Sequence, residues 1–219
     1  MPQSLITRSM IALILIGLIN GVSLPEEKSQ QSVKKDEFVS LIDGDDSAQF
    51  EIVGLDKNEI TLKDGEIRLT GANNKNCYFA TKEQFKNYVL QFEWMHEKHH
   101  GKPSDGNSGL MVHIQGPSKV WPKCVEVQIW YKDFGSFFTL GGGKFNPQRD
   151  DRQVRDKALK PLGEWNLQVV TCNNGAITLK VNGKEYAQGN NAMPDEGQIG
   201  WMFEGTPIRF RNLKIKKLK

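Results

Sequence analysis

Short apolar runs that alternate with polar residues fill the chain from Phe38 onward, and Gly, Asn and Asp separate them. Successive side chains of a strand point to opposite faces, so this period of two predicts β-strands. Strands are expected over Phe50–Val53, Ile60–Lys63, Glu66–Leu69, Tyr78–Ala80, Tyr88–His96, Gly109–Ile114, Cys124–Tyr131, Phe137–Leu140, Trp165–Thr171, Ala176–Val181, Gln198–Phe203 and Ile208–Lys216. Their short lengths and frequent turns indicate an all-β sandwich or barrel.

Tight turns separate several of these runs. Asp64-Gly65, Asn174-Gly175 and Asn182-Gly183 each lie between two runs, and such pairs tolerate the positive φ that hairpins require. The charged stretch from Asp150 to Leu162 is expected to be a loop with room for a short helix.

The N-terminus has the features of a secretory signal. Arg8 precedes an apolar run from Met10 to Ile19, and the small residues Gly21 and Ser23 follow. The run is shorter than the roughly 20 residues that span a bilayer, so cleavage is favoured over an uncleaved anchor. We expect a signal over residues 1–23, a flexible polar spacer over 24–36 and one domain over 37–219. The mature protein would be periplasmic or extracellular, without stable membrane association.

The net charge argues against a nucleic-acid partner, and the cysteine content argues against a disulfide framework. The net charge is only +3, and part of the surplus lies in the C-terminal Lys214, Lys216, Lys217 and Lys219, so no nucleic-acid partner is predicted. The three cysteines, Cys77, Cys124 and Cys172, are too few for a disulfide framework and are expected to serve as small buried apolar residues.

Alternation in three of the expected strands assigns side chains to faces. On the core side it places Leu90, Phe92, Trp94, Leu110, Val112, Ile114, Val125, Val127 and Ile129. If the three strands are neighbours, the opposite face carries Gln91, Glu93, Asn107, Gly109, Met111, His113, Glu126, Gln128 and Trp130. Carboxylates, amides, an imidazole and an indole suit a sugar, because they bind its hydroxyls and stack on its C–H face. The alternative is the ordinary solvated face of an antiparallel sheet.

Two segments carry a family resemblance. Residues Asp105 to Ile114, with Asn107-Ser108-Gly109, and Trp121 to Gln128, with Glu126-Val127-Gln128, resemble the centre of the 3-keto-disaccharide hydrolase domain family. Weaker matches extend the resemblance over Asp36 to Leu218. It implies a concanavalin-like two-sheet antiparallel β-sandwich, or jelly roll, usually exported and related to lectins and glucanases. It also implies activity on glycosides that a partner oxidoreductase has oxidised at C3.

A ketone at C3 defines the chemistry that such a site needs. The ketone acidifies the C2 proton, so a base can remove it, the C1 aglycone can leave, and water can add to the enone. We expect Glu126 or His113 as the base with the other as its partner, Lys123 or Gln128 beside the developing oxyanion, and Glu93 to orient the network. Substrate contacts are expected from Asn107, Met111, Trp121, Gln128 and Trp130. A direct mechanism with Glu93 and Glu126 as paired carboxylates is a less favoured alternative.

The remaining motifs carry weaker signals. His96, His99, His100 and Asp105 crowd one segment without a defined ligand spacing, so no metal and no cofactor are expected. Gly141-Gly142-Gly143-Lys144 lacks the full spacing of a phosphate loop and is interpreted as a glycine turn. The aromatic residues Trp121, Trp130, Tyr131, Phe134, Phe137 and Phe138 are either a sugar platform or packing beneath a loop.

Three functions remain open for an exported domain of this kind. The first is an enzyme that cleaves 3-keto-glycosides, with an oligosaccharide or glycoside as substrate. The second is a non-catalytic carbohydrate-binding module on the same fold, and the third is a structural or interaction protein. A carboxylate and an imidazole on adjacent strands would favour the enzyme.

Overall fold

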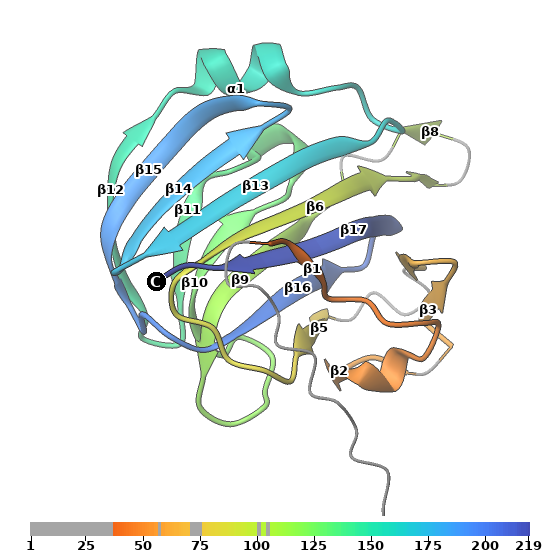
Figure 1. Ribbon diagram of the computed structural model, residues 1–219. Helices are drawn as coiled ribbons and strands as arrows, with labels where there is room; N and C mark the ends of the chain where they lie inside the picture. Colours follow the sequence, from red (N-terminus) through yellow and green to blue (C-terminus); the bar gives the residue numbers. More distant parts are fainter. Residues whose placement is uncertain (1–36, 57, 71–75, 100–101, 104–105) are drawn as a thin grey trace, which may run out of the picture. The chain divides into compact units, whose positions relative to one another are not determined.

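A computed structural model describes residues 37–56, 58–70, 76–99, 102–103 and 106–219 (Figure 1). The expected signal and spacer, together with His100 and Asp105, lie outside the described residues. Strands dominate, and the helix α1 (Arg152–Ala158) falls in the segment where a short helix was expected. The Asp151 carboxylate accepts a hydrogen bond from the Val154 backbone N–H at 3.0 Å and so caps this helix. None of the helices in the described ranges is long and apolar enough to cross a membrane.

The larger of two antiparallel sheets runs in the order β12-β15-β14-β13-β6-β17-β4-β3, with β1 also paired to β17. We call it the large sheet. Its strands are β1 (Val39–Ser40), β3 (Ile60–Lys63), β4 (Glu66–Leu69), β6 (Tyr88–His96), β12 (Lys144–Asp150), β13 (Asn166–Asn173), β14 (Ala176–Val181), β15 (Lys184–Met193) and β17 (Ile208–Lys217).

The small sheet runs in the order β11-β10-β9-β16-β5-β2. Its strands are β2 (Phe50–Val53), β5 (Asn76–Thr81), β9 (Ser108–Gln115), β10 (Lys123–Gln128), β11 (Phe137–Leu140) and β16 (Gln198–Glu204), and β7 (Lys98–His99) pairs separately with β8 (Lys102–Pro103). Short 3-10 turns, η1 (Ser47–Gln49) and η2 (Tyr131–Asp133), precede β2 and follow β10. The expected two-sheet sandwich is confirmed.

Aromatic side chains from both sheets meet in the core between them. Trp201 of β16 stacks on Phe79 of β5 with ring centroids 5.1 Å apart, and it meets Phe92 of the large sheet edge-on at 5.9 Å. All three are fully buried, so these contacts join the two sheets directly. The three cysteines are also buried, as expected.

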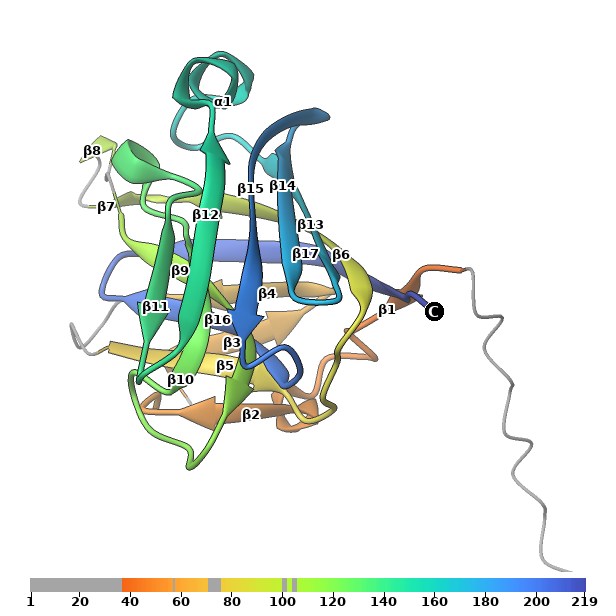
Figure 2. The ribbon, with the colours of Figure 1, turned by 90° about the vertical axis from the view of Figure 1, so that its left-hand side faces the viewer.

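Two long strands of the large sheet were not predicted. The inward side chains of β15 include the small Ala187 and Ala192, and the strand contains Gly189, so its apolar alternation is weak. The edge strand β12 is largely exposed and contains Pro147, which cannot donate a ladder hydrogen bond. Figure 2 shows β11 and β12 side by side, and the glycine turn at Gly141–Gly143 carries the chain from one sheet to the other.

An irregularity in β9 changes which residues face the core. Gln198 of β16 is opposite Ile114, but Gly200 is opposite Met111, so β9 contains one residue more than its partner over this stretch. His113 has a φ of 61° at this bulge. Beyond the bulge the alternation is inverted. Ile114 therefore lies with Met111 on the outer side of the sheet, whereas Leu110 and Val112 lie on the core side. The assignment of Ile114 to the core was therefore wrong.

The outer face of the small sheet is itself partly apolar. Tyr78, Ala80, Met111, Ile114, Cys124 and Met202 form a second buried cluster there, separate from the main core. A solvated outer face would expose such side chains, but these six are at most 3% exposed. The sequence alternation alone did not predict this cluster.

Candidate functional site

Glu126 lies on the outer face of the small sheet, at the middle of β10. It is directly opposite Met111 of β9 on one side and Phe138 of β11 on the other, and directly opposite residues share a face. Its side chain is only 4% exposed. None of the described residues donates a hydrogen bond to its carboxylate. Because a buried carboxylate is costly without donors, this residue is the centre of the candidate site.

Glycine at position 109 makes room for that carboxylate. Gly109 is on β9, next to β10, and a Cβ built there would overlap Glu126 Oε1 and crowd Cδ and Cγ. The Glu126 side chain therefore leans along the sheet across Gly109. A larger residue at 109 would displace it.

The three residues of the Asn107-Ser108-Gly109 motif have separate structural roles. The Asn107 Nδ2 amide donates to Glu204 Oε2, and the Ser108 hydroxyl donates to the Met202 carbonyl oxygen of the neighbouring strand. Gly109 admits Glu126. The motif thus links β9 to the carboxylates of β10 and β16, and we call Glu126, Glu204, Asn107, Gly109 and Gln128 the Glu126 site.

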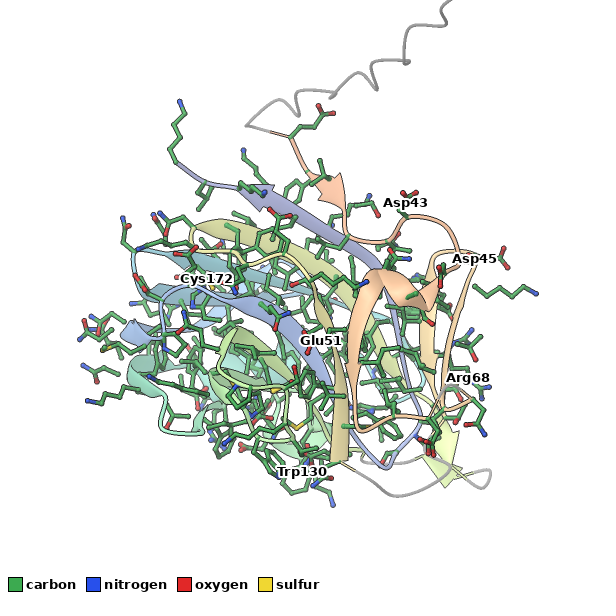
Figure 3. The ribbon with its side chains drawn as sticks, turned by 90° about the horizontal axis from the view of Figure 1, so that it is seen from below. Asp43, Asp45, Glu51, Arg68, Trp130 and Cys172 are labelled. Carbon is green, nitrogen blue, oxygen red and sulfur yellow. The ribbon has the colours of Figure 1, made fainter. Side chains whose placement is uncertain are left out.

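Gln128 shapes the end of β10. Its Oε1 atom accepts hydrogen bonds from the backbone N–H groups of Ile129 at 3.0 Å and Trp130 at 3.2 Å. These bonds turn the chain out of the strand into η2 and hold the Gln128 amide in one orientation. Trp130, labelled in Figure 3, is half-buried, and the Lys132 ammonium group lies 5.9 Å from its ring centroid.

Glu204 is a second carboxylate that the sequence analysis missed. It ends β16, two residues after Met202, so it shares the outer face of the small sheet. β9 lies between β10 and β16, which places Gly109 between the two strands that carry the carboxylates. The Asn107 Oδ1 atom is buried and has no hydrogen-bond partner among the described residues. An acceptor without a donor next to two carboxylates is consistent with a place for ligand hydroxyl groups.

Burial and charge both act on these carboxylates. Burial, and to a smaller extent the neighbouring Glu204 carboxyl, together raise the pKa of Glu126 to about 7. Burial also raises the pKa of Glu204, although the hydrogen bond from Asn107 opposes that effect. Glu126 can therefore exchange a proton near neutral pH, as an acid or base in catalysis must.

Some of the aromatic residues considered as a sugar platform pack inside the protein, and others are exposed. Phe134 is buried and stacks on Trp94 at 4.9 Å, and Phe137 packs against Phe145 at 4.5 Å. Phe138 is 42% exposed and lies directly opposite Glu126. The Phe138 ring is therefore available to a ligand at the Glu126 site.

The structure does not bring His113 to this face. The bulge turns its side chain inward, where it is fully buried, lies edge-on to Tyr88 of the large sheet at 5.7 Å, and places Nδ1 3.2 Å from the Pro194 carbonyl oxygen. Burial lowers its pKa. The expectation that His113 and Glu126 share a face was wrong, because alternation cannot reveal an inserted residue.

Glu93 lies on the other sheet. Its strand, β6, is between β13 and β17 in the large sheet, so β6 is no neighbour of β9 or β10. Glu93 Oε2 accepts hydrogen bonds from Arg211 Nε at 2.7 Å and Asn212 Nδ2 at 2.6 Å. Burial raises the pKa of Glu93, but these hydrogen bonds outweigh it and leave the pKa lowered. The predicted grouping of Glu93 with Glu126 was wrong.

The other predicted residues lie at varying distances from the site. Met111 is buried beside Glu126, as its position on the outer face required. Lys123 is exposed at the start of β10 with a register shift after it, and Trp121, 40% exposed, is in the loop before β10. No hydrogen bond or ion pair joins either residue to Glu126 within the described ranges. Roles in catalysis or binding for the predicted residues stay predictions.

At the far end of the same face, Glu51 of β2 holds the loop between β9 and β10. Its carboxylate accepts hydrogen bonds from Gln198 at 2.8 Å and from Ser118 of that loop; Glu51 is labelled in Figure 3. No group of three or more His, Cys, Asp or Glu side chains suited to a metal occurs among the described residues. His96 is buried, and its Nε2 lies 2.7 Å from the Ile129 carbonyl oxygen.

Comparison with known families explains the motifs at this site. A profile of the 3-keto-alpha-glucoside-1,2-lyase-like domain matches residues 37–216. The chain belongs to this family. The match confirms the resemblance seen in the sequence and covers both sheets apart from the last residue of β17. No curated protein matches the chain.

Several solved structures share this fold with the chain. A proposed glycosyl hydrolase from Parabacteroides distasonis superimposes with a TM-score of 0.63 at 18% identity, over 83% of this chain and 94% of that one. A second one from the same organism gives 0.60 at 20% identity, over 84% and 100%. The carbohydrate-binding module CBM66 from Bacillus subtilis gives 0.55 at 8% identity, over 77% and 96%. At these identities the likeness shows the shared jelly-roll fold.

Proposed function

We propose that this family member cleaves the glycosidic bond of sugars oxidised at C3, on the outer face of the small sheet, with Glu126 as the base. One observation carries the proposal: a carboxylate that is 4% exposed, accepts no hydrogen bond from the described residues and lies beside a second carboxyl group. An ordinary structural carboxylate would be paired or solvated. Family membership supports a 3-keto-glycoside as the substrate class.

The reaction begins with proton transfer from carbon. The ionised Glu126 carboxylate takes the C2 proton, and the electron pair of the C2–H bond moves toward the C3 carbonyl to give an enolate. The enolate electrons then form the C1–C2 double bond, the C3 carbonyl re-forms, and the bond from C1 to the aglycone oxygen breaks. The protonated Glu126 can return its proton to the departing oxygen. Water then adds across the C1–C2 double bond, so the net change is hydrolysis.

The proton affinity of Glu126 suits this step. A base works best when its pKa is near the working pH, because it is then both ionised and strong. Burial, with a smaller effect of Glu204, raises the pKa of Glu126 to about 7, so both its ionised and its protonated form are populated near neutral pH. The buried Asn107 Oδ1 is available to accept a hydrogen bond from a sugar hydroxyl, and Phe138 offers a ring face for the sugar C–H groups.

Two glutamate variants test the proposal. We expect Glu126→Gln to reduce turnover of a 3-keto-glycoside with a chromogenic aglycone by at least about 1,000-fold, because an amide cannot accept the proton. Glu93→Gln, on the outer face of the large sheet, is the matched control and should retain turnover. Full activity of Glu126→Gln with an intact fold would refute the assignment.

Carbohydrate binding without cleavage is the second candidate. The exposed Phe138 ring beside polar groups supports it, since such a surface binds sugar whether or not bonds are broken. Calorimetric titration with oxidised and unoxidised disaccharides separates the two functions. A binding module would hold both without releasing an aglycone, whereas the enzyme would consume the oxidised one.

The proposal includes export and a supply of oxidised substrate. The first 23 residues have the pattern of a cleavable signal, so the mature chain would begin at Leu24 and act in the periplasm or outside the cell. N-terminal sequencing of the protein from these fractions checks this: an intact Met1 would contradict it. An upstream oxidoreductase that converts the C3 hydroxyl to a ketone would provide the substrate.

A further inference from the structure

Glu204 and Asn107 form a fixed pair beside Glu126. Asn107 immediately precedes β9, and its Nδ2 amide donates to Glu204 Oε2 at the end of β16. The Glu126 side chain extends from β10 across Gly109, which is opposite Met202 and two residues from Asn107. The two carboxyl groups thus approach one another from opposite sides of β9, over the position without a side chain.

The other titratable groups on this face do not compete with Glu204. Cys124 lies on β10 itself, and burial raises the pKa of its thiol, so it is neutral. Burial raises the pKa of Tyr78 on β5 to about 12, so it is neutral as well. Glu51 on the edge strand β2 is held by Ser118 and Gln198. β9 and β11 present no titratable side chain to the outer face, because the bulge turns His113 inward. Among these strands, Glu204 is the charged neighbour that acts on Glu126.

We propose that Glu204 is a positioning residue that acts through Glu126: Asn107 holds it as a carboxylate, and its charge makes Glu126 a stronger base. The catalytic part of this inference rests on the function proposed above, but the coupling between the two carboxyl groups does not. A donated hydrogen bond favours the ionised form of Glu204, while a like charge disfavours ionisation of Glu126. Both effects act in one sense: they favour the charge on Glu204 at the expense of a charge on Glu126.

Removal of the Glu204 charge should lower the pH at which Glu126 titrates. In Glu204→Gln the shape of the side chain is kept, but the repulsion is gone, so Glu126 should ionise at lower pH. In Asn107→Ala the hydrogen bond that favours ionised Glu204 is lost, which should lower the midpoint of Glu126 by a smaller amount. A role in packing alone would leave that midpoint unchanged in both variants.

Carbon-13 NMR of the full chain, with labelled glutamate side chains, measures the titration of Glu126 directly, and Glu126→Gln assigns its signal. We expect the midpoint to fall by about one pH unit in Glu204→Gln. Glu51→Gln, which removes a carboxylate from the same face, should leave the titration midpoint of Glu126 unchanged. Unchanged midpoints in both Glu204→Gln and Asn107→Ala would overturn the inference.

Kinetics distinguish this inference from the proposed function. If wild-type protein turns over a 3-keto-glycoside, the pH profile of kcat/KM should move in Glu204→Gln by the same amount as the NMR midpoint, with little change in KM. If no turnover occurs but the NMR midpoint moves, the proposed function fails and the coupling stands. If turnover occurs and neither the midpoint nor the profile moves, the coupling fails and the proposed function stands.

Discussion

The carboxylate of Glu126 occupies the space that a Cβ at Gly109 would need. This relationship joins the two motifs that characterise the chain, since Gly109 belongs to Asn107-Ser108-Gly109 and Glu126 to Glu126-Val127-Gln128. Gly109 also matters more for function than for stability, because the space above it is filled by the Glu126 side chain of the neighbouring strand.

Substitution of Gly109 by alanine should impair function more than folding. The added methyl group must displace the Glu126 carboxylate, and a misplaced base loses roughly 100-fold in rate. The free energy of unfolding should fall by about 1 to 3 kcal/mol, as for other overpacked positions. Turnover and urea unfolding of Gly109→Ala measure both effects.

Gly200→Ala is the matched control for that variant. Gly200 lies on the same face, but a Cβ there would meet the ends of the Ile114 and Met111 side chains, which can move. We expect a comparable loss of stability with turnover within a few fold of wild type. Equal turnover in both alanine variants would show that Gly109 has no role in placing Glu126.

Burial of Glu126 should make stability depend on pH. Its pKa is raised from 4.5 to about 7, so the folded state favours the protonated form. This stabilisation is fully present below pH 4.5 and is lost as the pH rises toward about 7, by which point the loss amounts to about 3 kcal/mol. Glu126→Gln cannot ionise and should lose correspondingly less stability between pH 5 and pH 8. Urea unfolding at the two values checks this, and a parallel pH dependence of the two proteins would contradict it.

The exposed ring of Phe138 should contribute to sugar affinity. Its loss in Phe138→Ala removes a stacking surface opposite Glu126, and we expect KM or Kd to rise by about five- to tenfold. The variant should remain stable, because the ring is 42% exposed. Phe38→Ala is the matched control: that ring is 39% exposed but lies near β1 of the large sheet. Equal affinities of Phe138→Ala and wild type would exclude the platform.

The alternation of side chains was sufficient to predict most strands and the sandwich. Strands such as β6, whose residues alternate between buried and half-buried, were predicted with their observed bounds. The strands β12 and β15 were not predicted, because the exposure of β12 and the small inward residues of β15 weaken the alternation. In both cases neighbouring strands supply the pairing that local sequence does not reveal.

The site was harder to predict, because its geometry depends on strand order and on one inserted residue. Alternation placed Glu126 and Asn107 on one face correctly, but it could not show that β6 belongs to the other sheet or that β9 bulges at His113. Glu204 was missed because its partner, Asn107, is 97 residues away in the sequence. The alternation of Gly200, Met202 and Glu204 would have placed it on this face once β16 was known to lie beside β9.

Phe138 belongs to β11, the edge strand of the small sheet next to β10, so Glu126 lies one strand in from that edge. A saccharide chain that places one oxidised ring over Glu126 would therefore reach Phe138 first in that direction, and then β12, which lies beside β11 (Figure 2). The sugar units beyond the oxidised ring would be met by β11 and β12, and not by the strands that carry the two carboxylates.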